Sequence, residues 1–252
     1  MESWIQFGRG PLFRLCFVLM VLGLGRLLLM TVIGTVAAYR RNPDKIVPWK
    51  ELINKTFAWL IPVNRLWRKR PLYSTFSFLF HVGLIIVPLF LAAHVMLWHR
   101  SVGFGWFKLP QTLADRMTLL VIVTGAMLII GRVFNRNARF LSRWQDFIWP
   151  PLLMVPFVTG YACANLEVGP GAYRLLMLIH VFSGDLIIVM IPFTKIAHCV
   201  LMPLSQLVTG IGWKFPAGAG DRVIETLGYG GRPTWVDKPR LGGKPAPVEG
   251  EG

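Results

Sequence analysis

Five long stretches of the chain are almost wholly apolar, and the polar residues gather between them. A helix needs about 20 residues to cross the roughly 30 Å hydrocarbon core of a bilayer. The pattern therefore predicts an all-α integral membrane protein with five transmembrane helices. The expected spans are residues 11–38, 74–98, 114–134, 146–164 and 173–202.

Basic residues are concentrated in two of the four connections between these stretches. The first connection, 39–73, holds nine Lys and Arg residues against two acidic ones, and the segment 132–143 holds four arginines. Because connections rich in Lys and Arg stay on the cytoplasmic side of a membrane, we expect the N-terminus outside and the C-terminus in the cytoplasm. Within the first connection, residues 51–70 mix apolar and basic side chains, which is typical either of a helix lying on the membrane surface or of a plain basic loop.

Composition agrees with a membrane protein, since 54% of the residues are hydrophobic and only 15% are charged. The net charge of +15 lies in the connections, so the lipid bilayer explains it and no nucleic-acid partner is expected. The three cysteines form no CxxCH motif, which excludes a c-type haem attachment.

Histidines carry the candidate chemistry. His81 and His94 lie in the second span, His99 lies at its end, and His180 and His198 lie in the fifth span. The 18 residues from His180 to His198 make five helical turns, so in one continuous helix both would share a face, about 27 Å apart. The second and fifth spans run in opposite directions, so His81 should lie level with His198 near the inner surface, and His94 level with His180 towards the outer one.

Two histidine pairs at two levels predict two haems, each held between two imidazoles. Neutral imidazole is a good iron ligand, and coordination removes the cost of an unpaired polar group in lipid. The alternative is a haem-free network in which the histidines join helices by hydrogen bonds.

The spacing between His81 and His94 fits poorly with two ligands on one straight helix. The 13 residues between His81 and His94 place them about 140° apart around an ideal helix, although Pro88 between them can kink it. His99 is the rival ligand by periodicity. It lies beside Trp98 at the water boundary, where a haem would be poorly buried, so His94 is preferred.

Two segments resemble a known family. "FHVGLIIVPLFLAAHVMLW" (80–98) and "IPFTKIAHC" (191–199) are similar to the cytochrome b subunits that include the gamma subunit of respiratory nitrate reductase. The family also includes membrane subunits of heterodisulfide-reductase-like and sulfite-reduction-associated complexes. The resemblance covers about residues 10–205.

The resemblance implies a bacterial or archaeal cytoplasmic (inner) membrane, two haem b groups and quinone chemistry, for which menaquinone is expected. It makes His81 and His198 the inner haem ligands and His94 and His180 the outer ones. It also implies a cytoplasmic iron–sulfur subunit as partner. Residues 1–205 would form the di-haem membrane domain, and residues 206–252 a cytoplasmic tail on which the partner docks. The second ligand of the second span comes three residues later than in the nitrate reductase subunit, and the C-terminal extension differs.

Other ionisable residues lie in or beside the spans. Arg26 and Asp185 are each near the middle of an apolar stretch, and we expect them to face each other or a haem edge because an unpaired charge there is costly. Arg116 and Arg132, at the two ends of the third span, are candidate partners of haem propionates or ordinary topology charges.

His99 is the candidate for quinone chemistry. An imidazole exchanges protons near neutral pH, so His99 could line an outer quinone pocket near Trp98, Arg100 or Asp115, with Asp185 as a second proton-carrying group. The alternative is that His99 anchors the helix end at the interface.

The function expected from these features is electron transfer between the quinone pool and a cytoplasmic iron–sulfur partner through two b-type haems, as one subunit of a respiratory-chain oxidoreductase complex. The alternative is a haem-free membrane anchor, or a transporter that uses Arg26, Asp185 and Lys195 as a proton or solute path.

Overall fold

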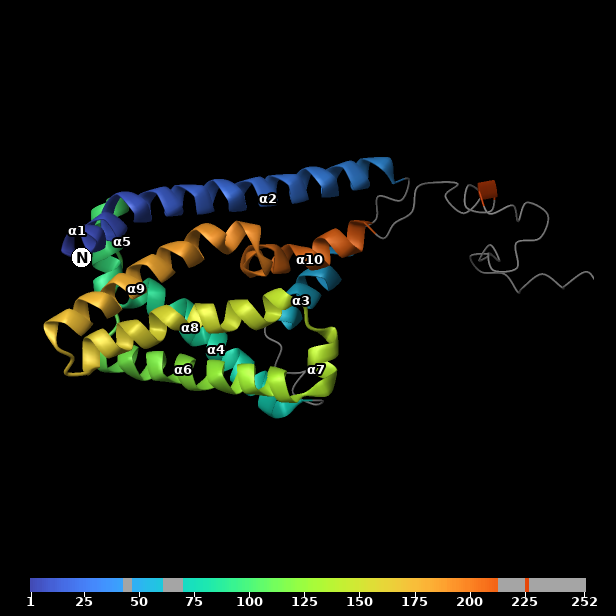
Figure 1. Cartoon of the computed structure of the whole chain (residues 1–252). Coiled ribbons are helices and arrows are strands. Elements are labelled where there is room, and N and C mark those ends of the chain that lie inside the picture. Colours follow the sequence, from blue (N-terminus) through green and yellow to red (C-terminus); the bar gives the residue numbers. More distant parts are fainter. Residues whose placement is uncertain (43–46, 61–69, 213–224, 227–252) are drawn as a thin grey trace, which may run out of the picture.

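The computed structural model describes residues 1–42, 47–60, 70–212 and 225–226, and these residues form helices joined by short connections without any strand. Figure 1 shows the helices lying side by side in one bundle. The α-helices are α1 (Glu2–Phe7), α2 (Phe13–Arg41), α3 (Trp49–Leu60), α4 (Pro71–Phe90), α5 (Ala92–Val102), α6 (Gln111–Phe134), α7 (Arg136–Leu141), α8 (Trp144–Asn165), α9 (Pro170–Met190) and α10 (His198–Gly212). A π-helical turn, η1 (Gly8–Leu12), joins α1 to α2, and two 3₁₀ turns, η2 (Ile191–Phe193) and η3 (Lys195–Ala197), join α9 to α10.

Five helical segments among the described residues are long and apolar enough to cross a membrane, which confirms the predicted number of spans. They are Glu2–Arg41, Pro71–Phe90, Gln111–Phe134, Trp144–Asn165 and Pro170–Phe193. We call the end of the bundle where α2 ends and α4 begins the basic end, because the connections rich in Lys and Arg lie there, and we call the other end the opposite end.

The core of the bundle lies between α4, α6 and α8. Phe80, Val87, Val121 and Phe157 form a buried cluster there. Gly83 allows the close approach of α4 to α6, because a Cβ at this position would lie 2.4 Å from the Val121 side chain. Small residues at helix contacts are the usual way in which membrane helices pack closely.

The first span lies at one side of the bundle. α2 packs against α9 and α10 and runs on past the end of α9 (Figure 1). Most of its other side chains are exposed leucine, valine, isoleucine and methionine, which suits a helix surface facing lipid.

The second span is interrupted at Leu91, whose extended backbone (φ −61°, ψ 132°) separates α4 from α5. The break lies three residues after Pro88, which removes one backbone donor from the helix. Two carbonyls at the break gain partners from the following loop: Trp106 Nε1 donates to Leu89 O at 2.8 Å, and the Leu109 amide donates to Phe90 O at 2.9 Å. The break is therefore stabilised by its own hydrogen bonds.

The fifth span is also not one continuous helix. α9 ends at Met190, and Thr194 has an extended backbone (φ −129°, ψ 179°) between the two 3₁₀ turns before α10 begins at His198. The expectation that five regular turns carry His180 to His198 along one helix is therefore wrong. The physical reason is the sequence around Pro192, which cannot continue the hydrogen-bond ladder of α9.

The first connection contains a helix, α3, as the surface-helix interpretation predicts. Leu52 of α3 is buried and packs against Gly210 of α10. The remainder of that predicted segment, 61–69, lies outside the described residues. The expected domain boundary at 205 falls inside α10, which continues to Gly212, and almost all of the expected docking tail lies outside the described residues.

Candidate functional site

The structure brings four histidines together as two pairs. His94 of α5 faces His180 of α9, with ring centroids 5.9 Å apart and ring planes inclined by 12°. His81 of α4 faces His198 of α10, with centroids 6.1 Å apart and planes inclined by 77°. These are the two pairings that the sequence predicts from the level of each histidine along the spans.

The two helix breaks explain how both pairs form. On one straight helix His81 and His94 would point in directions about 140° apart. The break at Leu91 gives α5 a direction of its own, and the 3₁₀ turns before α10 do the same for His198. Two irregular segments thus allow both histidine pairs to form, although the spacing would be unfavourable on ideal straight helices.

Three of the four imidazoles are oriented by a backbone carbonyl. Nδ1 lies 2.6 Å from Ser77 O in His81, 2.8 Å from Pro156 O in His180 and 2.7 Å from Lys195 O in His198. A carbonyl only accepts, so Nδ1 must donate and the proton of a neutral ring lies there. This tautomer leaves the Nε2 lone pair free, as metal-binding histidines require.

His94 differs from the other three. Its Nδ1 is buried and makes no hydrogen bond of good geometry among the described residues. The carbonyls of Val87 and Pro88, just before the break at Leu91, lie close enough to interact with its ring. His94 is therefore held less tightly than the other three imidazoles, and it is not left without acceptors.

Gly160 of α8 makes room for the His180 ring. A Cβ at this position would lie 2.8 Å from Cε1 and 3.0 Å from Nδ1 of His180. The carbonyl that holds this ring belongs to Pro156, one turn earlier on α8. α8 therefore both holds the imidazole, through the Pro156 carbonyl, and makes room for it beside Gly160.

Exposure distinguishes the two pairs. His94 and His180 are half-buried, whereas His81 and His198 are exposed on the surface of the bundle. The His81–His198 pair therefore lies where a group at the surface of the bundle could reach it.

Arg26 does not face Asp185, so this half of the expectation is wrong, and a position beside a haem edge stays a prediction. Gly23, one turn before Arg26, packs against Pro192, which follows the last turn of α9. Arg26 therefore lies towards the basic end of the bundle, with its side chain exposed. The error arises because helix Glu2–Arg41 is much longer than the other spans, so the middle of its apolar stretch is not the middle of the bundle.

Asp185 is buried, with 4% of its surface exposed. Its Oδ2 has no hydrogen-bond partner among the described residues. The residue facing it is Gly8 of η1, where a Cβ would lie 3.7 Å from that oxygen. Asp185 thus lies on α9 between His180 and the end of the helix at Met190, and it keeps one carboxyl oxygen available.

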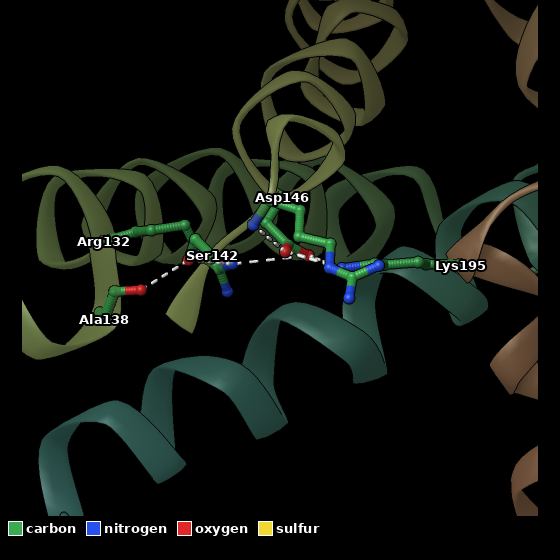
Figure 2. A network of polar contacts seen from close by, with 6 residues as sticks. Arg132, Ala138, Ser142, Asp146 and Lys195 are labelled. Carbon is green, nitrogen blue, oxygen red and sulfur yellow. Dashed lines mark hydrogen bonds and ion pairs between the residues drawn. The ribbon is translucent and has the colours of Figure 1, made fainter. Parts of the chain in front are cut away.

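Arg132, a candidate partner of a haem propionate or an ordinary topology charge, joins a polar network at the basic end (Figure 2). Its Nη1 donates to Ser142 Oγ at 3.2 Å and lies 3.7 Å from Asp146 Oδ1. Lys195 Nζ donates to both oxygens of Asp146, at 2.8 and 2.7 Å. Arg116 is exposed near the start of α6.

His99 is exposed at the end of α5 and belongs to neither pair. Gly105 of the following loop lies next to its ring, where a Cβ would be 3.7 Å from Nδ1. Asp115, expected near His99, accepts hydrogen bonds from Gln111 and Asn165 instead. Trp98 packs edge-on against Phe13 and Phe17, so it fastens α5 to α2.

Sequence reasoning missed the link between Asp146 and Lys195. A signal for it was present, because a lone acid in the first turn of one span and a lone lysine at the end of another are both predicted at the basic end. The carbonyls of Ser77 and Pro156, which accept hydrogen bonds from His81 and His180, could not be found from the sequence, because every residue has a backbone oxygen.

The fold and these pairs define a five-span helical membrane protein with two pairs of facing histidines. The chain belongs to the same family as a protein of Nitratidesulfovibrio vulgaris strain Hildenborough, to which it is 33% identical over 182 residues, which is 72% of this chain and 79% of the relative. No family model matches the chain, and no solved structure matches it.

Proposed function

We propose that the protein is the cytochrome b subunit of a membrane redox complex and carries electrons between a quinone and an iron–sulfur partner through two b-type haems. His81 and His198 would hold one haem, and His94 and His180 the other. The basic end would face the cytoplasm and the partner, since it carries the connections rich in Lys and Arg.

The observation that carries the proposal is the separation of the paired rings. With about 2 Å for each metal–nitrogen bond and about 1.2 Å from the bound nitrogen to the ring centre, two imidazoles on one metal have centres about 6.4 Å apart. The two pairs have centroid separations of 5.9 and 6.1 Å. Direct hydrogen bonding between imidazoles is absent from both pairs among the described contacts, and three of the rings already use Nδ1 on a carbonyl.

The environment of the rings also suits the group. The orienting carbonyls leave Nε2 of three rings free to bind a metal, and the fourth ring, His94, has a buried Nδ1 and faces His180. Beside Gly184, one turn from His180, a Cβ would meet no atom within 4 Å. A haem bound at each pair would supply a one-electron carrier without covalent attachment.

Quinone chemistry requires a site for protons close to the electron carrier. We place it at the opposite end, where His94 and His180 lie. Among the described residues, Asp185 lies five residues from His180 on α9 and has a carboxyl group that can hold a proton, and His99 at the surface has an imidazole that can exchange one with water. Menaquinone is the expected quinone.

The ligand assignment is tested by removing one histidine at a time from the purified protein. His81→Ala and His198→Ala should each abolish one haem, and His94→Ala and His180→Ala should each abolish the other. His99→Ala is the matched control, because it removes an imidazole from the same helix as His94, and it should retain both haems. Loss of a haem in His99→Ala, with both retained in His94→Ala, would contradict the assignment.

The quinone assignment needs a separate measurement. In Asp185→Asn and His99→Ala, quinol-driven reduction of the haems should slow while both haem spectra stay intact. Unchanged turnover and unchanged inhibitor sensitivity in both variants would contradict a proton-carrying role for these side chains.

The alternative function, a haem-free anchor or transporter, is favoured by one observation. Transporters build their sites at interrupted helices, and this chain has interruptions at Leu91 and between Met190 and His198. Both interruptions, however, end next to a histidine pair. An absorption spectrum of the purified protein without haem bands would favour the alternative.

A further inference from the structure

We infer that Arg9, in the π-helical turn η1, binds a propionate of the haem at His94 and His180. The inference rests on the proposed function, since it needs a haem at this pair. Arg9 Nη2 donates to Met177 Sδ at 2.9 Å, and Met177 lies on α9 three residues before His180. The guanidinium is also near enough to His180 and to Cys163 of α8 for its charge to act on both side chains. Arg9 therefore lies beside this histidine pair, where α8 and α9 meet.

The packing of η1 against α9 brings Arg9 to this position. Gly8 lies directly against Val181, since a Cβ at residue 8 would overlap Cγ1 of that side chain. Met177 and Val181 are four residues apart, so they lie on the same face of α9. Because Gly8 holds η1 on this face, the side chain of the next residue reaches Met177.

The described protein supplies no anion for this cation. A thioether sulfur is only a weak acceptor, whereas a guanidinium presents a planar fork of donors that matches a carboxylate. The ion pairs between described residues do not include Arg9. Arg9 is half-buried, and a cation withdrawn from water favours an anion beside it.

Membrane topology does not account for the position of Arg9. Lys and Arg gather in cytoplasmic connections, whereas α1, which η1 continues, lies at the opposite end of the bundle (Figure 1). The phosphate of a lipid headgroup is the other anion available at that end, and an arginine that binds it extends towards the water. Arg9 instead contacts the half-buried Met177, so its guanidinium is directed to the side of the histidine pair, which favours the propionate.

The test compares Arg9→Gln with Arg14→Gln in the purified full-length protein, by optical redox titration of both haems. Arg14→Gln is the matched control, because it removes the same charge from an exposed position on the same helical segment. A nearby cation stabilises the reduced, less positive iron. In Arg9→Gln the reduced-to-oxidised ratio of the haem at His94 and His180 should therefore fall about tenfold at a fixed potential, which is about 59 mV for a one-electron couple. The other haem, and both haems of Arg14→Gln, should titrate as in the wild type.

A spectroscopic readout separates direct contact from the effect of a distant charge. Arg9→Lys keeps the charge and loses the planar fork, so it should recover most of the potential. The resonance Raman bands of the propionates should nevertheless shift in both Arg9→Lys and Arg9→Gln, and stay unchanged in Arg14→Gln. If Arg9→Gln does not fold, Arg9→Lys decides by its propionate bands alone.

The outcomes distinguish this inference from the proposed function. A wild type with two haems, whose potentials and propionate bands are unchanged in Arg9→Gln, would overturn the role of Arg9 and leave the proposed function standing. A wild type without haem would contradict the proposed function itself. Equal shifts in Arg9→Gln and Arg14→Gln would overturn the inference as an effect of net charge, and loss of a bound phospholipid with both haems unchanged would assign Arg9 to a lipid headgroup instead.

Discussion

Lys195 links the first turn of α8 to the ligand position of His198. Its Nζ donates to both carboxylate oxygens of Asp146, at 2.8 and 2.7 Å, and its carbonyl accepts from His198 Nδ1 at 2.7 Å. Asp146 in turn accepts from the Arg143 amide at 2.9 Å, which fixes the carboxylate at the start of its helix. The irregular segment before α10 is thus held at the same residue that orients the imidazole.

Asp146→Asn should weaken this connection. The Asp146 carboxylate is mostly buried while the Lys195 side chain is about half exposed, so the expected loss in the free energy of unfolding is about 1 kcal/mol. The more specific result is a changed spectrum or redox potential of the haem at His81 and His198, with the other haem unchanged.

Glu51→Gln provides the control for this variant, because it removes the largely exposed Lys55–Glu51 pair at 3.6 Å. It should change neither the stability nor a haem. If Asp146→Asn altered both haems equally, or neither, the network would not act through His198.

Gly160→Ala should perturb the haem at His94 and His180. A Cβ there would lie 2.8 Å from the His180 ring, and overpacking of this kind typically costs 1–3 kcal/mol. The expected result is loss or a spectral shift of this haem alone, measured by optical redox titration. Gly131→Ala on α6 is the control, because a Cβ at that position meets no atom within 4 Å. Equal spectra of the two variants would show that Gly160 is not needed to make room for the His180 ring.

The two pairs should differ in electron paramagnetic resonance. The imidazole planes are inclined by 77° at His81 and His198 and by 12° at His94 and His180. Axial ligands tune haem iron, and crossed planes act on two iron d orbitals alike whereas parallel planes separate them. The oxidised protein should therefore give a strongly anisotropic low-spin signal and a rhombic one.

The assignment of these signals follows from the variants. His198→Ala should remove the strongly anisotropic signal, and His180→Ala the rhombic one. Two identical signals in the wild type would mean that the ring planes observed here are not those of the haem-bound protein.

Membrane orientation is testable with reporter fusions. The nine basic residues of the connection 39–73 predict that a reporter placed after residue 55, or after Gly212, is cytoplasmic, and that one placed after residue 105 is outside. A cytoplasmic reporter at residue 105 would reverse the proposed path between the quinone and the partner.

Much of this architecture can be predicted from the sequence. The number of spans follows from apolar length alone, and the two pairings follow from the level of each histidine on antiparallel helices. Pro88 indicates that the second span can kink, but the full break at Leu91 could not be predicted, because it depends on donors such as Trp106 that come from the following loop. The depth of Arg26 was mispredicted for a related reason, since depth is set by the contact of Gly23 with Pro192 and not by position within an apolar run.

The most direct test of the account is the haem content of the purified full-length protein, measured by its reduced-minus-oxidised spectrum together with haem and protein quantification. The account predicts two b-type haems per chain, both released by acid acetone because no cysteine is placed to hold them. The full-length, folded protein should be purified from cells that make haem. If this protein contains no haem, the central claim is contradicted. A single haem that is retained after removal of either histidine pair would contradict it too.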